Sequence, residues 1–163
     1  GGCFWCMEDA FEKIKGIEEV ISGYSGGNTE NPTYKEVTYG DTGHFETAKI
    51  IYDNDIINYK QILNFFWQNI DPFDSAGQFC DKGLSYRSVA FYTDENEKNK
   101  IKNSIINIEK KFKGKKVVTF TKKFEIFYPA EEYHQDYYQE NFMNYLLYKK
   151  ACGREKILKK IWD

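Results

Sequence analysis

The chain has 163 residues, and its 23 Lys and Arg against 25 Asp and Glu leave a formal net charge of −2. This length suits one domain with a sizeable core, so we expect residues 1–163 to form a single domain with a C-terminal tail from about residue 148. The balanced charge offers no general attraction to nucleic acid or to an anionic membrane. No apolar run approaches the ~20 residues that a membrane-spanning helix needs.

Four cysteines in a chain of this length do not form the dense pattern of a disulfide-stapled secreted scaffold. The sequence lacks an initiator Met and a signal-like apolar start, so we expect it to begin part-way into a gene product. The cytoplasm is the expected compartment, and a removed signal peptide leaves the periplasm or secretion as alternatives.

The first half of the chain predicts a helix, two strands and a second helix. Residues 3–14 carry apolar side chains at helical spacing, and Gly16 ends that pattern. Residues 19–24 and 43–53 are predicted strands, separated by a turn-rich loop. Residues 59–70 form an amphipathic helix that stops at Asp71-Pro72.

The second half begins with a loop over residues 71–85, whose length is typical of a functional loop. A strand at 86–93 and a helix from the capping residue Asp94 to about Phe112 follow. We predict another strand at 115–121, a helical region from 128–139 with Pro129 near its first turn, and a helical tail.

With one strand at or upstream of Gly1, the first six elements would read βαββαβ, the order of a ferredoxin-like sheet. A Gly-Gly pair directly before a helix suits a strand-to-helix turn. We therefore predict an α/β (α+β) chain with a ferredoxin-like two-layer core, extra helices and long loops.

Cys3 and Cys6 lie in the opening stretch "GGCFWC". Cys3 falls at the N-cap or first turn, where free N–H groups and the helix dipole favour a thiolate nucleophile; a small buried residue is the alternative. A zinc site needs a second ligand pair, and the other candidate ligands are scattered singly (Cys80, Cys152, His44, His134), so no metal is expected. A thioredoxin-type dithiol is a further alternative, against which the two bulky residues between the thiols argue.

Several side chains could surround such a thiol. Phe4 and Trp5 could wall an apolar pocket suited to a methyl or thioether group, or could simply pack in the core. Glu46 shares a strand face with apolar residues, which would raise its pKa, although an exposed carboxylate at a strand start remains the alternative. The remaining polar candidates are Asp81, Tyr86 and Arg87 in the long loop and His134 in the last helical region.

Six motifs together resemble the methionine sulfoxide reductase A family, from Gly2 to about Tyr138: "GCFWC", "GYSGG", "NPTY", "GDTGHFE", "YRS" and "YPAEEYHQDYY". The resemblance implies a catalytic domain that reduces methionine S-sulfoxide, protein-bound or free, without a cofactor and with thioredoxin as reductant. The roles it implies are a nucleophile (Cys3), a cage for the S-methyl group (Phe4, Trp5), an acid (Glu46), phenolic donors (Tyr34, Tyr86) and residues at the mouth of the site (Asp81, His134).

Oxygen transfer to Cys3 would leave a sulfenic acid, which a second thiol converts to a disulfide. Many members of the family carry a small residue where Cys6 stands and a cysteine pair in a Gly-rich tail, whereas this tail has only Cys152. We favour Cys152 as the resolving thiol, because a Gly-flanked tail can swing toward Cys3. Cys6 comes next and Cys80 third, and a one-cysteine cycle with an outside thiol is a further alternative. We expect a monomer; the competing classes are a metal-clipped binding module and a general dithiol oxidoreductase.

Overall fold

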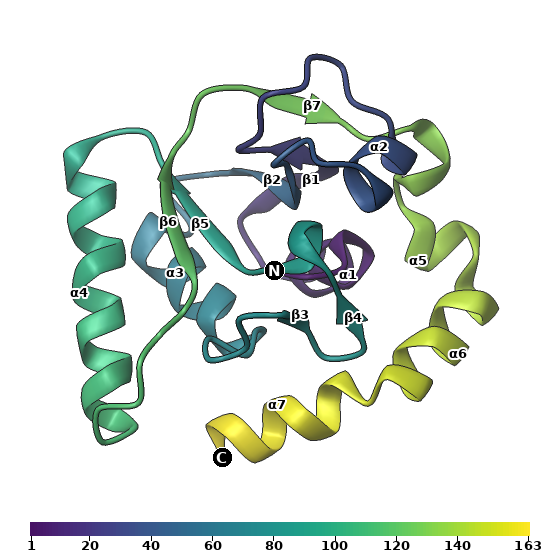
Figure 1. The fold of residues 1–163 in the computed structure, drawn as a ribbon. Helices are drawn as coiled ribbons and strands as arrows, with labels where there is room; N and C mark the ends of the chain where they lie inside the picture. Colours follow the sequence, from purple (N-terminus) through teal and green to yellow (C-terminus); the bar gives the residue numbers. More distant parts are fainter.

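The computed structural model describes residues 1–163 as a mixed chain of helices and small sheets, which confirms the predicted α/β class (Figure 1). Its first half contains α1 (Phe4–Glu12), β1 (Ile17–Ser25), α2 (Tyr34–Tyr39), β2 (Phe45–Tyr52) and α3 (Tyr59–Gln68). The middle contains β3 (Gly77–Gln78), β4 (Asp81–Lys82), the 3₁₀ turn η1 (Leu84–Tyr86), β5 (Val89–Tyr92), α4 (Glu95–Lys111) and β6 (Phe120–Lys123). The last part contains β7 (Phe127–Pro129), η2 (Glu132–His134), α5 (Tyr137–Glu140), α6 (Phe142–Cys152) and α7 (Arg154–Trp162).

β1 is the central strand of the largest sheet, whose order is β2-β1-β7 with both pairings antiparallel. Tyr24 on β1 lies opposite Glu46 on β2 and opposite Tyr128 on β7. β5 and β6 pair in parallel as a separate ribbon, and β3 and β4 form a short hairpin. The central strand therefore has the start of β2 on one side and β7 on the other.

The structure differs from the sequence prediction at three local places. Residues 128–129 begin as strand rather than helix, because Tyr128 pairs with Tyr24 and Pro129 sits at an edge, where a missing N–H is tolerated. The strand predicted at 115–121 forms only from Phe120. The loop before residue 45 contains α2, which starts with a capping box between Thr33 and Glu36.

Nothing from Gly1 onward forms the strand predicted at or upstream of Gly1, since Gly1 and Gly2 lead into α1 without strand pairing. β2 and β5 do not pair with each other, and an apolar cavity of about 350 Å³ lies between them. The strands thus make three small sheets rather than one continuous sheet.

The core has three parts. The largest packs α1, β1, α3 and α4 together through Met7, Phe11, Val20, Trp67 and Ile101 among others. A second cluster joins Phe4, Tyr24, Val37 and Ala130, and a third joins Cys3, Cys6 and Tyr145.

The C-terminal helices pass along the lower edge of the molecule, beneath α1 and the β3–β4 hairpin (Figure 1). Trp162 Nε1 donates to the carbonyl of Ile70 at 3.1 Å, and Arg154, which is buried, donates to the carbonyl of Asn69 at 2.6 Å. The predicted tail is therefore docked on the core. None of the helices has the length and apolar character needed to cross a membrane.

Candidate active site

Cys3 is the N-cap of α1, as predicted, and its carbonyl accepts the N–H groups of Cys6 and Met7. The turn before it depends on Gly2, whose φ of +80° suits glycine and whose Cα lies against Gln78. Cys3 is only 5% exposed. It nevertheless forms part of the wall of a cavity.

The cavity has a volume of about 220 Å³, and eight residues line it: Cys3, Phe4, Trp5, Tyr34, Glu46, Asp81, Tyr86 and Tyr148. Seven of these are site residues predicted from the sequence. They come from α1, α2, β2, β4 and η1, so the fold brings together side chains that are up to 83 positions apart (3 to 86). His134 and Cys152 are the predicted residues that do not line this cavity.

Glu46 is the acidic group of the cavity. It is 2% exposed, and its Oε2 accepts the N–H of Phe4 at 3.0 Å. Burial raises the pKa of Glu46 to about 8, and the hydrogen bond from Phe4 opposes that rise. The carboxyl is therefore mostly protonated at neutral pH and can donate a hydrogen bond or a proton.

Two phenols stand together at the cavity, with the hydroxyl oxygens of Tyr34 and Tyr86 3.3 Å apart. Burial, together with the charge of Glu46, raises the pKa of Tyr86 above its ordinary value, so it stays a donor. Glu131 anchors the first phenol: it accepts the backbone N–H of Tyr34 at 3.0 Å and the hydroxyl of Tyr24 at 2.9 Å. Glu131 stands in the "YPAEEYHQDYY" motif but is not among the site residues predicted from the sequence.

Phe4 and Trp5 supply the aromatic wall. Trp5 stacks on Tyr137, with ring centroids 3.7 Å apart, and its Nε1 donates to His134 Nδ1 at 3.2 Å. His134 is buried behind the two aromatic residues, and burial lowers its pKa, so the ring is neutral with its proton on Nε2. Its direct contact in this structure is with Trp5, which it orients.

Tyr148 on α6 is a cavity residue that the sequence analysis did not identify. Its hydroxyl donates to Asp81 Oδ2, and the phenol partly opposes the rise that burial causes in the pKa of Cys3. Burial raises the pKa of Asp81. The available signal was the spacing of Tyr145 and Tyr148, which puts two phenols on one face of α6.

Cys3 and Cys6 form a hydrogen-bonded pair of thiols in the first turn of α1. Burial raises the pKa of Cys3 well above its ordinary value, and Cys6 adds to that rise. The hydrogen bond from Cys3 lowers the pKa of Cys6 to about 7, helped by the charge of Arg154. The helix start was predicted to ionise Cys3 itself; instead the negative charge belongs to the pair, because two adjacent thiolates repel each other.

The other two cysteines are bonded to each other. Cys80, between β3 and β4, and Cys152, at the end of α6, form a disulfide with an S–S distance of 2.07 Å. Cys152, ranked first for the reaction with oxidised Cys3, is therefore held by Cys80 in this structure, while Cys6 is the free thiol beside Cys3.

Two groups bring three potential metal ligands within 4.8 Å of one another: Cys80, Asp81 and Cys152, and Glu8, Glu12 and Asp136. Neither group includes Cys3 or Cys6, and the first is already joined by the disulfide. The cavity instead combines one sulfur nucleophile, Cys3, with protonated oxygen donors. That combination suits reduction of a polar oxygen-bearing group by cysteine sulfur.

The fold and cavity define an α/β oxidoreductase that works through cysteine thiols. Comparisons with known proteins agree: the family described as "Peptide methionine sulfoxide reductase" matches residues 1–163. MsrA of Listeria monocytogenes is 47% identical over 163 residues, covering 99% of this chain and 92% of that protein. MsrA 2 of Staphylococcus aureus is 43% identical over 164 residues, with the same coverages.

Solved structures show the same relationship. Reduced Mxr1 from Saccharomyces cerevisiae superposes with a TM-score of 0.79 at 30% identity, covering 86% of this chain and 81% of that one. Methionine sulfoxide reductase A of Corynebacterium diphtheriae, at 24% identity, shares the fold with a TM-score of 0.77 and covers 86% of this chain and 71% of that one. The chain belongs to the peptide methionine sulfoxide reductase A family, and its reaction is the reduction of peptide methionine (S)-sulfoxide.

Proposed function

We propose that Cys3 attacks the sulfur of methionine sulfoxide while Glu46 delivers a proton to the sulfoxide oxygen. Tyr34 and Tyr86 donate hydrogen bonds to the same oxygen as negative charge develops on it. In the balanced step, the Cys3 thiol takes up the oxygen as a sulfenic acid, its sulfur is oxidised by two electrons, and the thioether of methionine is released. The observation that carries this proposal is the joint lining of one cavity of about 220 Å³ by these four residues.

The aromatic wall indicates how the substrate is held. Phe4 and Trp5 offer an apolar surface for the S-methyl group, and the stacking of Trp5 on Tyr137 keeps that surface rigid. Asp81 lies in the cavity wall and is placed to approach the substrate backbone, with His134 acting behind Trp5. The substrates are oxidised proteins or free methionine sulfoxide.

The two cysteine pairs suggest how Cys3 is restored. Cys6 condenses with the sulfenic acid of Cys3 to give a disulfide and water. The reduced Cys80 and Cys152 then exchange with this disulfide, which frees Cys3 and Cys6 and leaves the Cys80–Cys152 bond. Cys152 thus takes part in recycling, and its position at the end of α6, before Gly153, supports a tail that moves.

An external dithiol closes the cycle by reducing Cys80–Cys152. We assign this role to thioredoxin, because Cys80 is exposed and accessible to a protein partner. The enzyme acts as a monomer in the cytoplasm, where such reductants keep thiols reduced.

The test uses purified protein, each sulfoxide epimer separately, and dithiothreitol as reductant. We expect turnover of the S epimer and none with Cys3→Ser. A second measurement maps the disulfides after a single turnover by mass spectrometry. Turnover in Cys3→Ser would overturn the assignment of the nucleophile, and a Cys3–Cys152 linkage formed first would replace Cys6 by Cys152 as the resolving thiol.

A further inference from the structure

Tyr145 lies between Cys6 and Asp9, at the contact between α6 and α1. We propose that Tyr145, held in place by Asp9, is a positioning residue that orients Cys6 for its reaction with oxidised Cys3. This inference rests on the proposed function, in which Cys6 is the first thiol to react with the sulfenic acid.

The contacts of Tyr145 are buried and specific. Tyr145 is 3% exposed, and its hydroxyl donates to Asp9 Oδ2 at 2.7 Å. Tyr145 packs directly with Cys3 and Cys6 in one buried cluster, and its phenol is one of the groups that act to lower the pKa of Cys6. The phenol oxygen is therefore fixed at a point from which it sets the direction of the Cys6 sulfur.

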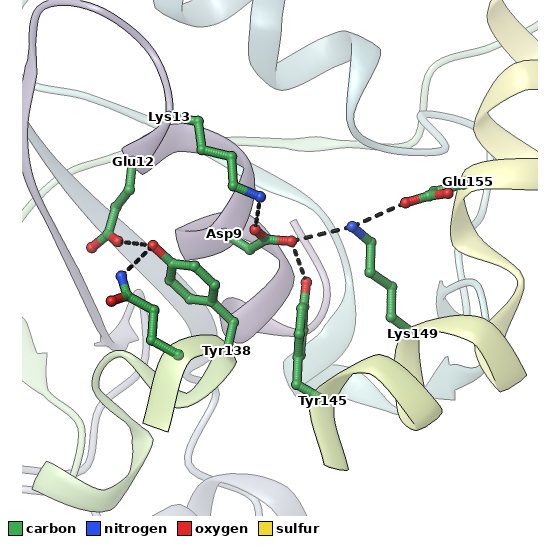
Figure 2. A network of polar contacts seen from close by, with 8 residues as sticks. Asp9, Glu12, Lys13, Tyr138, Tyr145, Lys149 and Glu155 are labelled. Carbon is green, nitrogen blue, oxygen red and sulfur yellow. Dashed lines mark hydrogen bonds and ion pairs between the residues drawn. The ribbon is translucent and has the colours of Figure 1, made fainter. Parts of the chain in front are cut away.

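Asp9 anchors this arrangement through several donors (Figure 2). Besides the hydrogen bond from Tyr145, it accepts hydrogen bonds from Lys13 on its own helix and from Lys149 Nζ of α6, the latter at 3.2 Å. Lys149 also forms an ion pair with Glu155 at 3.0 Å. Burial acts to raise the pKa of Asp9, but the hydrogen bonds from Lys13, Tyr145 and Lys149 outweigh it and lower that pKa. The carboxylate stays charged and keeps two ammonium partners even when the Tyr145 hydroxyl turns away.

This geometry matches the needs of the condensation. In that step the S–H bond of Cys6 and the S–O bond of the Cys3 sulfenic acid break, the S–S bond forms, and water leaves. While Cys6 is protonated, the phenol oxygen can accept a hydrogen bond from its S–H and keep donating its own hydrogen bond to Asp9. When Cys6 loses its proton, the phenol hydrogen can turn to the thiolate, because Asp9 retains its two lysines.

A neighbouring contact in the same view provides a matched control. Tyr138 donates to Glu12, one helical turn along α1 from Asp9, so it is also a phenol–carboxylate contact between α1 and the C-terminal region (Figure 2). The groups acting on Cys6 do not include Tyr138. Tyr138→Phe therefore removes a similar hydrogen bond while keeping the ring that packs against the cluster of Cys3, Cys6 and Tyr145.

The experiment follows a single turnover of the fully reduced chain with one equivalent of S-sulfoxide. Methionine formation reports the attack by Cys3, and quenched alkylation with peptide mapping reports formation of the Cys3–Cys6 disulfide. In Tyr145→Phe we expect disulfide formation to slow by about tenfold, as for loss of a hydrogen bond to a charged group, with methionine formation close to wild type. Tyr138→Phe should resemble wild type in both.

The pH profile of disulfide formation separates positioning from a loss of structure. Tyr145→Phe removes one of the hydrogen bonds that lower the pKa of Cys6, so its profile should move to higher pH. The other titratable groups acting on or facing Cys6 stay the same: Cys3, Arg154, Asp81, Tyr148 and Glu46. Asp9→Asn should slow disulfide formation too, and Asp9→Glu should restore part of the rate.

The outcomes are distinguishable. Without methionine formation in the wild type, the proposed function itself fails. If methionine forms but Cys3 joins a cysteine other than Cys6, the role of Cys6 fails and the inference with it. A Cys3–Cys6 disulfide formed in Tyr145→Phe at the wild-type rate and with the wild-type pH profile would overturn the positioning role alone.

Discussion

The backbone N–H of Phe4 donates to Glu46 Oε2 at 3.0 Å, which joins the first residue of α1 to the second residue of β2. The bond uses one of the free N–H groups at the helix start, so it holds the carboxyl beside the residue that follows Cys3. Because only one oxygen of Glu46 is engaged, the other is available to the cavity. A local feature of the helix end thus sets the distance between nucleophile and acid.

Replacing Glu46 by Gln should remove the proton donor while keeping an acceptor for the Phe4 N–H. We expect the rate of sulfoxide reduction to fall by about 10²- to 10⁴-fold, the usual contribution of a general acid. With the pKa of Glu46 raised to about 8, the wild-type rate should decline as pH rises through 8, since the protonated form is the active one. Stopped-flow or quenched single-turnover assays between pH 6 and pH 10 measure both effects, and an undiminished rate in Glu46→Gln would exclude Glu46 as the acid.

Although Glu46→Gln should lower activity, it should raise the stability of the folded chain relative to wild type as the pH rises. The pKa of Glu46 is about 8 in the folded chain against an ordinary value of 4.5, so the unfolded chain loses this proton first. The stabilisation is complete below pH 4.5 and is lost as pH rises toward 8, by up to about 1.4 kcal/mol per pH unit. The unfolding temperature of Glu46→Gln should therefore rise relative to that of wild type between pH 5 and pH 8. A difference that stays constant with pH would contradict the buried, neutral carboxyl.

How much of this site the sequence could predict depends on how far apart the interacting residues lie along the chain. Cys3 at a helix start and Glu46 on an apolar strand face follow from local patterns, and both positions are confirmed. The spacing of Tyr145 and Tyr148 puts both on one face of α6, but it does not show that this face meets the cavity, because α6 carries exposed apolar residues and lacks a clear apolar stripe. Its inward face is defined by contacts with α1 and β4 that are more than 60 residues away in the chain.

The elements of the fold also divide into those that local sequence patterns predict and those that depend on contacts with distant residues. Strands β1 and β2 and helices α3 and α4 were predicted from periodicity and capping residues, which act within one element. β7 was missed, because three residues ending in Pro129 carry no periodic signal and are strand only through their pairing with β1. The charge shared by Cys3 and Cys6 was likewise beyond prediction, since it depends on how deeply α1 is buried.

Tyr34→Phe and Tyr86→Phe should each reduce the rate of methionine formation, by about 10²-fold if each phenol supplies one hydrogen bond to the developing oxyanion. Their hydroxyl oxygens are 3.3 Å apart, so each also orients the other. The double variant should consequently lose less than the product of the two single losses. Single-turnover rates of the three variants test this, with circular dichroism to check folding; fully multiplicative losses would mean that the two phenols act independently.

Cys152→Ser should lower the stability of the oxidised protein by opening the only disulfide, which links residues 72 positions apart. The loss of loop closure in the unfolded chain corresponds to roughly 4 kcal/mol. Cys80→Ser should give the same loss, and the double variant should add nothing further, because both remove one bond. Urea unfolding of the oxidised proteins gives these values, with reduced wild type as the control that should match the variants. If Cys152→Ser unfolded at the same urea concentration as oxidised wild type, α6 would be held by its contacts with Asp9 and Asp81 alone.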